Sequence, residues 1–338
     1  MWKLTESGTI EKSLEINHVT EQLSNHDVEI ICGAWHPEGS FVVTGLSDGR
    51  VCMWDMDGEL LFSRHYHDKR VHGVAWNPSG RILCSYGADG KCIWYESEEI
   101  QQIYTCNQHI GAILDVAWRD DYILASASAD STIVLYGITG QPVDDADDTP
   151  AQHRGQVLQV LTGHKDEVNS IRWDFARNDL FSVSDDLTVR VWNVQITHES
   201  QDGSEKWVAN ARTKLTLDDH SKEISCLAVV PKLDRVHNFA TGSYDGTICL
   251  WDAQVGTRLR KFSGEIGPVS AIDISPCGQY LACSCLDHIV ACWDLSDTSL
   301  CFKRVFDAPV MGIQWDRTSR RLAAFLNSGE IKVCCRNT

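Results

Sequence analysis

An aspartate, a histidine and a serine recur together along the chain, and side chains of these three types can form a catalytic triad. In a triad the histidine removes the serine proton while the aspartate orients the histidine ring. His164, Ser184 and Asp186 make one such set, and Trp192 follows them. The set returns at many places with an aromatic residue, whereas a catalytic site occurs once. The sequence therefore predicts a structural role for these sets and no enzyme activity.

The recurring set is complete in two copies and degenerates in the others. Trp94 comes one residue early in the second copy, Tyr136 replaces tryptophan in the third, and Gly45 replaces serine in the first. The sixth copy lacks the histidine, and the seventh has Ser328 and Cys334 in place of aspartate and tryptophan. The assigned members are His26, Asp48 and Trp54; His67, Ser85, Asp89 and Trp94; His109, Ser128 and Asp130; His164, Ser184, Asp186 and Trp192; His220, Ser243, Asp245 and Trp251; and Ser284, Asp287 and Trp293.

The turn aspartates are regularly spaced, which indicates an internal repeat. Successive positions from Asp48 to Ser328 are 41, 41, 56, 59, 42 and 41 residues apart. A period of this size is typical of a four-stranded propeller blade. Runs such as Thr188–Trp192 are rich in β-branched residues and bounded by turns, so they predict strands. The sequence predicts an all-β, seven-bladed β-propeller in one domain, 1–338, with repeats near 27–61, 68–105, 110–160, 165–217, 221–261, 266–304 and 308–335.

The two long intervals contain insertions at 141–156 and 195–212, each before the fourth strand of its blade. The last copy ends near Cys335 and lacks a fourth strand. Thr9–Ile16 alternates in polarity, so we expect the N-terminal residues 1–20 to supply the strand that closes the last blade. Pairing both chain ends in one blade would remove exposed sheet edges.

The composition excludes several classes of function. A formal net charge of −17 and a pI near 5.1 disfavour direct binding to nucleic acid or to an anionic membrane. No run of 18 apolar residues predicts a membrane span. The 14 cysteines are scattered through strand-like runs, and no Cys-x-x-Cys pair has a partner at zinc spacing. We therefore expect no metal or cofactor, and a reducing compartment.

Three segments resemble a known family of WD-repeat propellers, the transducin beta-like corepressor subunits. They are His109–Trp118, the stretch GHKDEVNSIRWDFARNDLFSVSDDLTVRVW at 163–192, and DDHSKEISCLAVVP at 218–231. The resemblance implies that each turn aspartate pairs with the histidine, the serine and the tryptophan of its copy. It also implies a nuclear subunit of a histone-deacetylase corepressor complex that contacts histones and other subunits. The alternatives are a cytoplasmic location and a scaffold or substrate receptor in another complex, such as a ubiquitin ligase or an RNA-processing assembly.

In such propellers the loops around the turn aspartates share one rim, and here that rim is acidic. Tyr244 supplies an aromatic anchor, so we expect a basic peptide such as a histone tail to bind at this rim. The alternative is that the acidic side chains are only a solvated surface. Trp207, in the second insertion, either packs on its blade or docks a partner. Four bases stand against nine acids, which are Asp27, Glu29, Asp68, Asp166, Glu167, Asp185, Glu223, Glu265 and Asp307.

Overall fold

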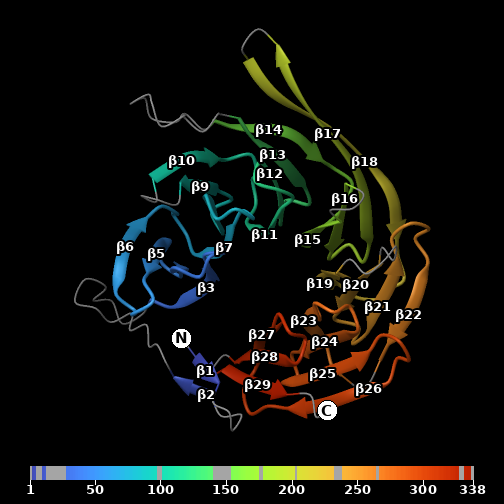
Figure 1. The fold of residues 1–338 in the computed structure, drawn as a ribbon. Helices are drawn as coiled ribbons and strands as arrows, with labels where there is room; N and C mark the ends of the chain where they lie inside the picture. Colours follow the sequence, from blue (N-terminus) through green and yellow to red (C-terminus); the bar gives the residue numbers. More distant parts are fainter. Residues whose placement is uncertain are drawn as a thin grey trace. The chain divides into compact units, whose positions relative to one another are not determined.

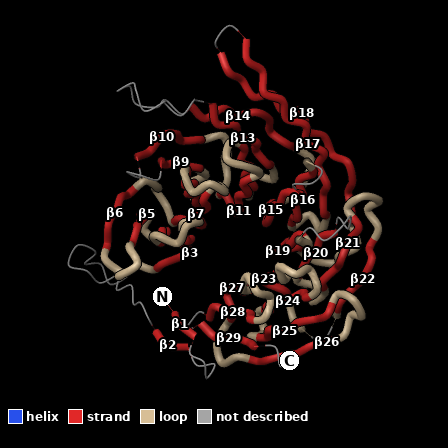
Figure 2. Tube along the Cα trace, in the orientation of Figure 1, coloured by secondary structure: helices blue, strands red, loops and turns tan. Residues whose placement is uncertain are grey.

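The regular structure of the chain consists of β-strands. The computed structural model describes residues 2–4, 10–12, 28–96, 101–139, 154–174, 178–201, 204–231, 238–263, 266–326 and 331–335. Every regular element in these ranges is a strand (Figure 2). The described residues therefore contain no helix that is long and apolar enough to span a membrane. Besides a short two-stranded sheet at the N-terminus, the strands of this part form seven successive sheets, six of four strands and one of three. This is the seven-bladed β-propeller arrangement, which confirms the predicted all-β fold class.

The first of two compact units contains Met1–Thr162 and Gln195–Asn210, and three of the sheets belong to it (Figure 1). Sheet 1 is β3 (Ile30–Trp35), β4 (Val42–Leu46), β5 (Arg50–Trp54) and β6 (Leu60–His65). Sheet 2 is β7 (Val71–Trp76), β8 (Ile82–Gly87), β9 (Cys92–Glu96) and β10 (Gln101–Cys106). Sheet 3 is β11 (Ile113–Trp118), β12 (Ile123–Ser128), β13 (Ile133–Thr139) and β14 (Arg154–Leu161).

The second unit contains Gly163–Val194 and Ala211–Thr338, with sheets 5 to 7 and most of sheet 4; the parts of the third and fourth strands of sheet 4 within Gln195–Asn210 belong to the first unit. Sheet 4 is β15 (Val168–Asp174), β16 (Asp179–Ser184), β17 (Val189–Gln201) and β18 (Ser204–Leu217). Sheet 5 is β19 (Ile224–Val229), β20 (Asn238–Ser243), β21 (Ile248–Asp252) and β22 (Arg258–Phe262). Sheet 6 is β23 (Val269–Ile274), β24 (Tyr280–Cys285), β25 (Ile289–Asp294) and β26 (Leu300–Val305), and sheet 7 is β27 (Val310–Trp315), β28 (Arg321–Leu326) and β29 (Ile331–Cys335).

The core lies in the inner strands of each sheet. All residues of β4, β12, β16 and β24 are buried, and these strands carry apolar and small side chains on both faces. Such continuous runs are typical of strands that pack on both sides. The outer strands β22 and β26 are mostly exposed, which matches their charged sequences RLRKF and LCFKRV.

A β-bulge interrupts the pairing of the first and second strands in each of the seven sheets. In sheet 4, for example, Val168 pairs with Ser184 and Ser170 with Val183, so Asn169 is left out of the ladder. A bulge of this kind turns one side chain away from the regular alternation. The residues at this position, called bulge residues below, are Ile31, His72, Leu114, Asn169, Ser225, Ser270 and Met311.

Two short N-terminal strands form a sheet of their own. β1 (Trp2–Leu4) pairs with β2 (Ile10–Lys12), in the register Leu4 with Ile10. Thr9 and residues 13–16 lie outside the described residues, as does most of the insertion at 141–156. Closure of the last blade by Thr9–Ile16 and the single-domain limits 1–338 therefore stay predictions.

Candidate functional site

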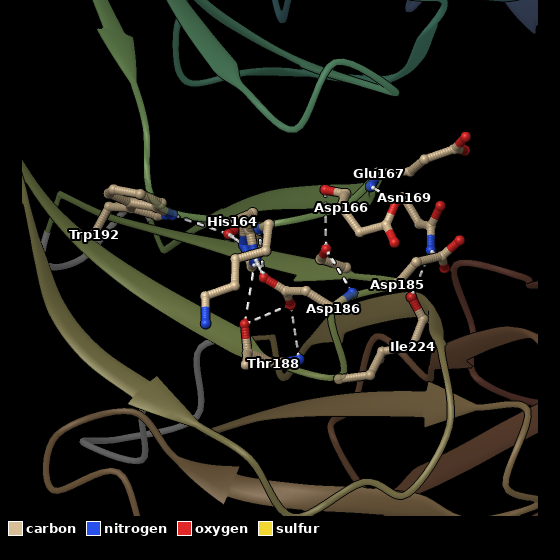
Figure 3. A network of polar contacts seen from close by, with 12 residues as sticks. His164, Asp166, Glu167, Asn169, Asp185, Asp186, Thr188, Trp192 and Ile224 are labelled. Atoms are coloured by element: carbon tan, nitrogen blue, oxygen red, sulfur yellow. Dashed lines mark hydrogen bonds and ion pairs between the residues drawn. The ribbon is translucent and has the colours of Figure 1, made fainter.

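The imidazole of His164 joins a carboxylate to a hydroxyl in sheet 4 (Figure 3). Its Nδ1 lies 2.9 Å from Asp186 Oδ2, and its Nε2 lies 2.8 Å from Ser182 Oγ. Trp192 donates its indole N–H to the same Ser182 oxygen at 2.9 Å. An ionised carboxylate only accepts hydrogen bonds, so Nδ1 carries the ring proton and Nε2 accepts the Ser182 hydroxyl proton.

Three other sheets repeat this bridge with nearly the same distances. In each, Nδ1 faces the turn aspartate and Nε2 faces a hydroxyl on the second strand. The distances in sheet 2 are 3.0 Å for His67–Asp89 and 2.7 Å for His67–Ser85; in sheet 3 they are 2.9 Å for His109–Asp130 and 2.7 Å for His109–Ser126; in sheet 5 they are 3.1 Å for His220–Asp245 and 2.8 Å for His220–Thr241.

The hydroxyl assigned from sequence is wrong in three sheets, because the bridging hydroxyl lies further from the turn. Ser184 Oγ instead donates to Asp166 O at 3.2 Å and accepts the N–H of Asp186 at 3.0 Å, so it shapes the turn. Ser243 makes the equivalent contacts in sheet 5, and Ser128 accepts the N–H of the turn aspartate in sheet 3. The ring Nε2 points away from the turn, so only the hydroxyl two residues deeper in the strand reaches it.

The aromatic residue assigned in sheet 2 is also wrong. Tyr95, rather than Trp94, occupies the network position, and its hydroxyl lies 2.8 Å from Ser85 Oγ. Trp94 lies on the other face of β9 and donates its indole N–H to Cys92 Sγ at 3.2 Å. Neighbouring residues of a strand point to opposite faces, so the one-residue difference decides which ring joins the network.

The described residues of sheets 1 and 6 make other contacts. In sheet 1, Asp48 accepts from Arg50 Nε at 2.6 Å, and the Trp54 indole donates to Thr44 Oγ1 at 2.9 Å. In sheet 6, Asp287 is exposed and Trp293 is buried, so the network assigned to these two from sequence is incorrect. The physical reason is that no histidine precedes the first strand of this sheet to connect them, since His288 lies in the turn itself, directly after Asp287. His26 and Ser328 lie outside the described residues.

The pKa values fit a neutral histidine beside an ionised aspartate. Burial lowers the pKa values of His109, His164 and His220, although the adjacent carboxylates oppose this shift. Burial also disfavours ionisation of Asp245, but hydrogen bonds from Thr247, the Ser221 backbone and His220 outweigh it and lower its pKa to about 2. The bridges of sheets 3, 4 and 5 therefore hold an anion in place without a buried positive charge.

This chemistry is structural because no substrate can reach the hydroxyl. Ser182 is fully buried and already bonded to both His164 and Trp192. No group of three potential metal-ligating side chains occurs in the described ranges. The bridges tie the loop before each sheet to its second and third strands.

The acidic edge is the second candidate site, and it lies where sheets 4 and 5 present their turns. We define it as Asp166, Glu167, Asp185 and Glu223. Asp185 Oδ1 accepts from Asn169 Nδ2 at 2.6 Å. Burial raises the pKa of Asp185, and the charges of Glu223 and Asp166 raise it further. The backbone N–H of Tyr244 donates to Glu223 O at 3.0 Å, which places this residue next to the edge, and burial and the Asp185 charge raise the pKa of its phenol.

Two other predicted binding residues, which lie in the first unit, already make contacts within the chain. Asp68 is exposed but accepts from Lys91 Nζ at 2.5 Å. Trp207 donates its indole N–H to Ile138 O at 2.8 Å, stacks on Tyr122 and contacts His198. The structure therefore supports the alternative that Trp207 packs on a blade, and its assignment as a partner-docking residue is not supported.

Hydrogen bonds from the bulge residues to neighbouring sheets were missed by the sequence analysis. His72 Nδ1 donates to Ile113 O at 2.9 Å, where β11 begins. Asn169 Nδ2 donates to Ile224 O at 2.9 Å in the same way. Ser225 Oγ donates to Val269 O at 2.7 Å. The shared signal is a polar side chain directly after the first apolar residue of the first strand.

Comparison with known proteins identifies the repeat. The model of the WD domain, G-beta repeat, matches residues 17–55, 155–193, 211–252 and 256–294, and that of the anaphase-promoting complex subunit 4 WD40 domain matches 53–121. The chain is 30% identical to nuclear distribution protein nudF 1 of Talaromyces marneffei, over 83% of this chain and 71% of that protein. The chain belongs to the WD40-repeat family. It is also 27% identical to the WD40 repeat-containing protein HOS15 of Arabidopsis thaliana over 83% of this chain, and 28% identical to nuclear distribution protein PAC1 of Arthroderma benhamiae over 85%.

The chain spans 42% of HOS15 and 63% of PAC1, so part of each relative has no counterpart in it. Within the chain, three of the matched WD40 repeats, at 155–193, 211–252 and 256–294, are offset from a sheet by one strand. The match at 155–193 covers β14 of sheet 3 and then the first three strands of sheet 4. The match at 256–294 likewise covers β22 of sheet 5 and three strands of sheet 6. Each of these repeats therefore contributes to two sheets.

Proposed function

We propose that this WD40-repeat chain is a non-catalytic scaffold that binds basic segments of other proteins at the acidic edge. The observation that carries the proposal is the gathering of carboxylates at the turns of two neighbouring sheets, where Asn169 Nδ2 donates both to Asp185 Oδ1 at 2.6 Å and to Ile224 O of sheet 5 at 2.9 Å. Burial raises the pKa of Asp185, and repulsion by the charges of Glu223 and Asp166 raises it further. A bound lysine or arginine side chain would relieve this repulsion.

In its finer form, the proposal is that the partner is a histone tail and that the chain is a subunit of a nuclear histone-deacetylase corepressor complex. The resemblance of three segments to the transducin beta-like subunits supports this form. Likeness to the nuclear distribution proteins supports a second candidate, a scaffold of a different assembly. Affinity purification distinguishes them: recovery of a histone deacetylase supports the first, and recovery of another set of proteins without it supports the second.

The binding test compares two charge-reversed variants with the unmodified protein. The first variant changes Asp166, Glu167 and Glu223 to lysine. A fluorescent histone-tail peptide should bind the unmodified protein with an affinity that falls as salt increases, because several exposed pairs of about 0.2–1 kcal/mol each must act together. The edge variant should lose most of this binding in fluorescence anisotropy.

The matched control carries the same change of net charge elsewhere. Glu38, Asp57 and Glu59 are exposed in turns at the opposite ends of the sheet 1 strands, and the control variant changes them to lysine. It should keep most of the binding. If both variants weaken binding equally, the attraction is only overall acidity, and the proposed edge is wrong.

A further inference from the structure

The residues that directly precede the turn aspartate occupy one equivalent position in sheets 4, 5 and 6. The backbone N–H of Asp185 donates to Glu167 O at 3.0 Å, that of Tyr244 to Glu223 O at 3.0 Å, and that of Leu286 to Pro268 O at 2.9 Å. These bonds fix each residue at the same height against the first strand of its own sheet. Asp185, Tyr244 and Leu286 therefore form a row across three successive sheets.

The row is continuous because the three sheets are bonded to one another beneath it. Asn169 connects sheet 4 to Ile224 of sheet 5, and Ser225 connects sheet 5 to Val269 of sheet 6. Sheets packed face to face are about 10 Å apart. An extended peptide rises about 3.3 Å per residue, so one step along the row corresponds to about three peptide residues.

The chemistry changes along the row from acidic to apolar. Asp185 lies among the carboxylates of the acidic edge, and Tyr244 follows with 38% of its surface exposed. Leu286 is 54% exposed on its turn, and Met311, the bulge residue of the adjoining sheet 7, is 66% exposed. Large apolar side chains gathered beside charged residues are typical of protein-binding surfaces. The negative charge at the acidic end of the row favours a positively charged partner segment.

We propose that this row binds an extended segment of a partner protein that carries a lysine or arginine, then an apolar residue about three positions away, and a second about six positions away. The basic side chain lies at Asp185 and Glu223, and the apolar side chains lie on Tyr244 and Leu286. This inference rests on the proposed function and adds the apolar requirement to it. Charge alone would select any basic tail, whereas the row selects a spaced motif.

The test uses three fluorescent synthetic peptides of about 12 residues in a glycine–serine background. The first has a lysine pair followed by leucines at the predicted spacing, the second has serines in place of the leucines, and the third has the same leucines at other spacings. Anisotropy should give an affinity about tenfold or more higher for the first peptide, since each buried leucine adds a substantial apolar contribution.

The protein variant Leu286→Ser should remove that preference and bind the first two peptides with similar affinity. Val255→Ser is the matched control, because Val255 is 61% exposed in the turn between β21 and β22, at the other ends of the strands. It should keep the preference. Both residues are exposed, and unchanged thermal unfolding will establish that the variants fold.

The outcomes separate this inference from the proposed function. Equal, salt-dependent binding of all three peptides would overturn the apolar motif and leave basic-segment binding in place. A preference that Leu286→Ser does not change would overturn the row as its site. If no peptide binds even at low salt, both the inference and the proposed function are wrong.

Discussion

The turn aspartate of each bridge is stable in its buried site because several neighbouring groups donate hydrogen bonds to its carboxylate. Asp186 receives hydrogen bonds from His164, from the Lys165 backbone and from both the backbone and hydroxyl of Thr188. An unpaired buried carboxylate is costly, so the network exists as a unit or not at all. Sheet 6 illustrates this, since no histidine precedes its first strand and its turn aspartate, Asp287, is exposed.

Replacing Asp186 by alanine should therefore lower the free energy of unfolding by about 1–3 kcal/mol. The change leaves the His164 N–H and the Thr188 hydroxyl without their acceptor in a buried site. Asp287→Ala, at the same position of sheet 6, should change it by no more than about 0.5 kcal/mol. Urea unfolding of both variants checks the comparison, and equal losses would contradict the network.

The residue types of the bridge were predicted from sequence, but the bridging hydroxyl was misassigned in three sheets. Ser182 and Ser184 lie two residues apart on one strand, so strand alternation places both on the same face. Only the position of the ring distinguishes them, and that depends on the loop holding His164. The second copy contained the missing signal, because Ser85 already lies four residues before Asp89, as Ser182 does before Asp186.

At the scale of elements, the strands could be predicted but the length of one hairpin could not. The stretch 195–212 reads as a polar loop, yet β17 and β18 extend through most of it. The reason is a contact distant in sequence. Trp207 bonds to Ile138, and Gln156 Nε2 donates to Trp207 O at 3.2 Å, so sheet 3 anchors the hairpin. A local pattern contains no information about such a contact.

Trp207→Phe should lower the free energy of unfolding of this region by about 1 kcal/mol, because it keeps a ring but loses the bond to Ile138 O. Trp207→Ala should cost about 1–3 kcal/mol, since it also removes the contacts with Tyr122 and His198. Val208→Ala is the control, because Val208 is the next residue of β18 and is 36% exposed. Hydrogen exchange of the β17 and β18 amides will measure the losses, and similar protection in all variants would show that Trp207 does not anchor the hairpin.

At the scale of the whole chain, the buried histidines determine how the free energy of unfolding changes with pH between about 5 and 7. The net charge alone does not determine the direction of this change. Burial lowers the pKa values of His109, His164 and His220 below 6.5, the value for an unperturbed imidazole. The unfolded chain therefore binds protons at a higher pH than the folded chain does. The lowered pKa of Asp245, about 2, affects stability only in stronger acid, below about 3.8.

Stability should fall as the pH decreases below about 6.5, and it should continue to fall until the folded-state histidines are themselves protonated. Each histidine contributes a slope of at most about 1.4 kcal/mol per pH unit, because one proton is taken up on unfolding. Urea unfolding at pH 7.5 and 5.0 measures the loss. His164→Gln cannot be protonated, so its loss between these pH values should be smaller than that of the unmodified chain, although the variant is less stable at both. A stability that rises toward pH 5.0 would mean that the imidazoles are charged in the folded chain, and the assigned direction of proton donation from Nδ1 alone would then be wrong.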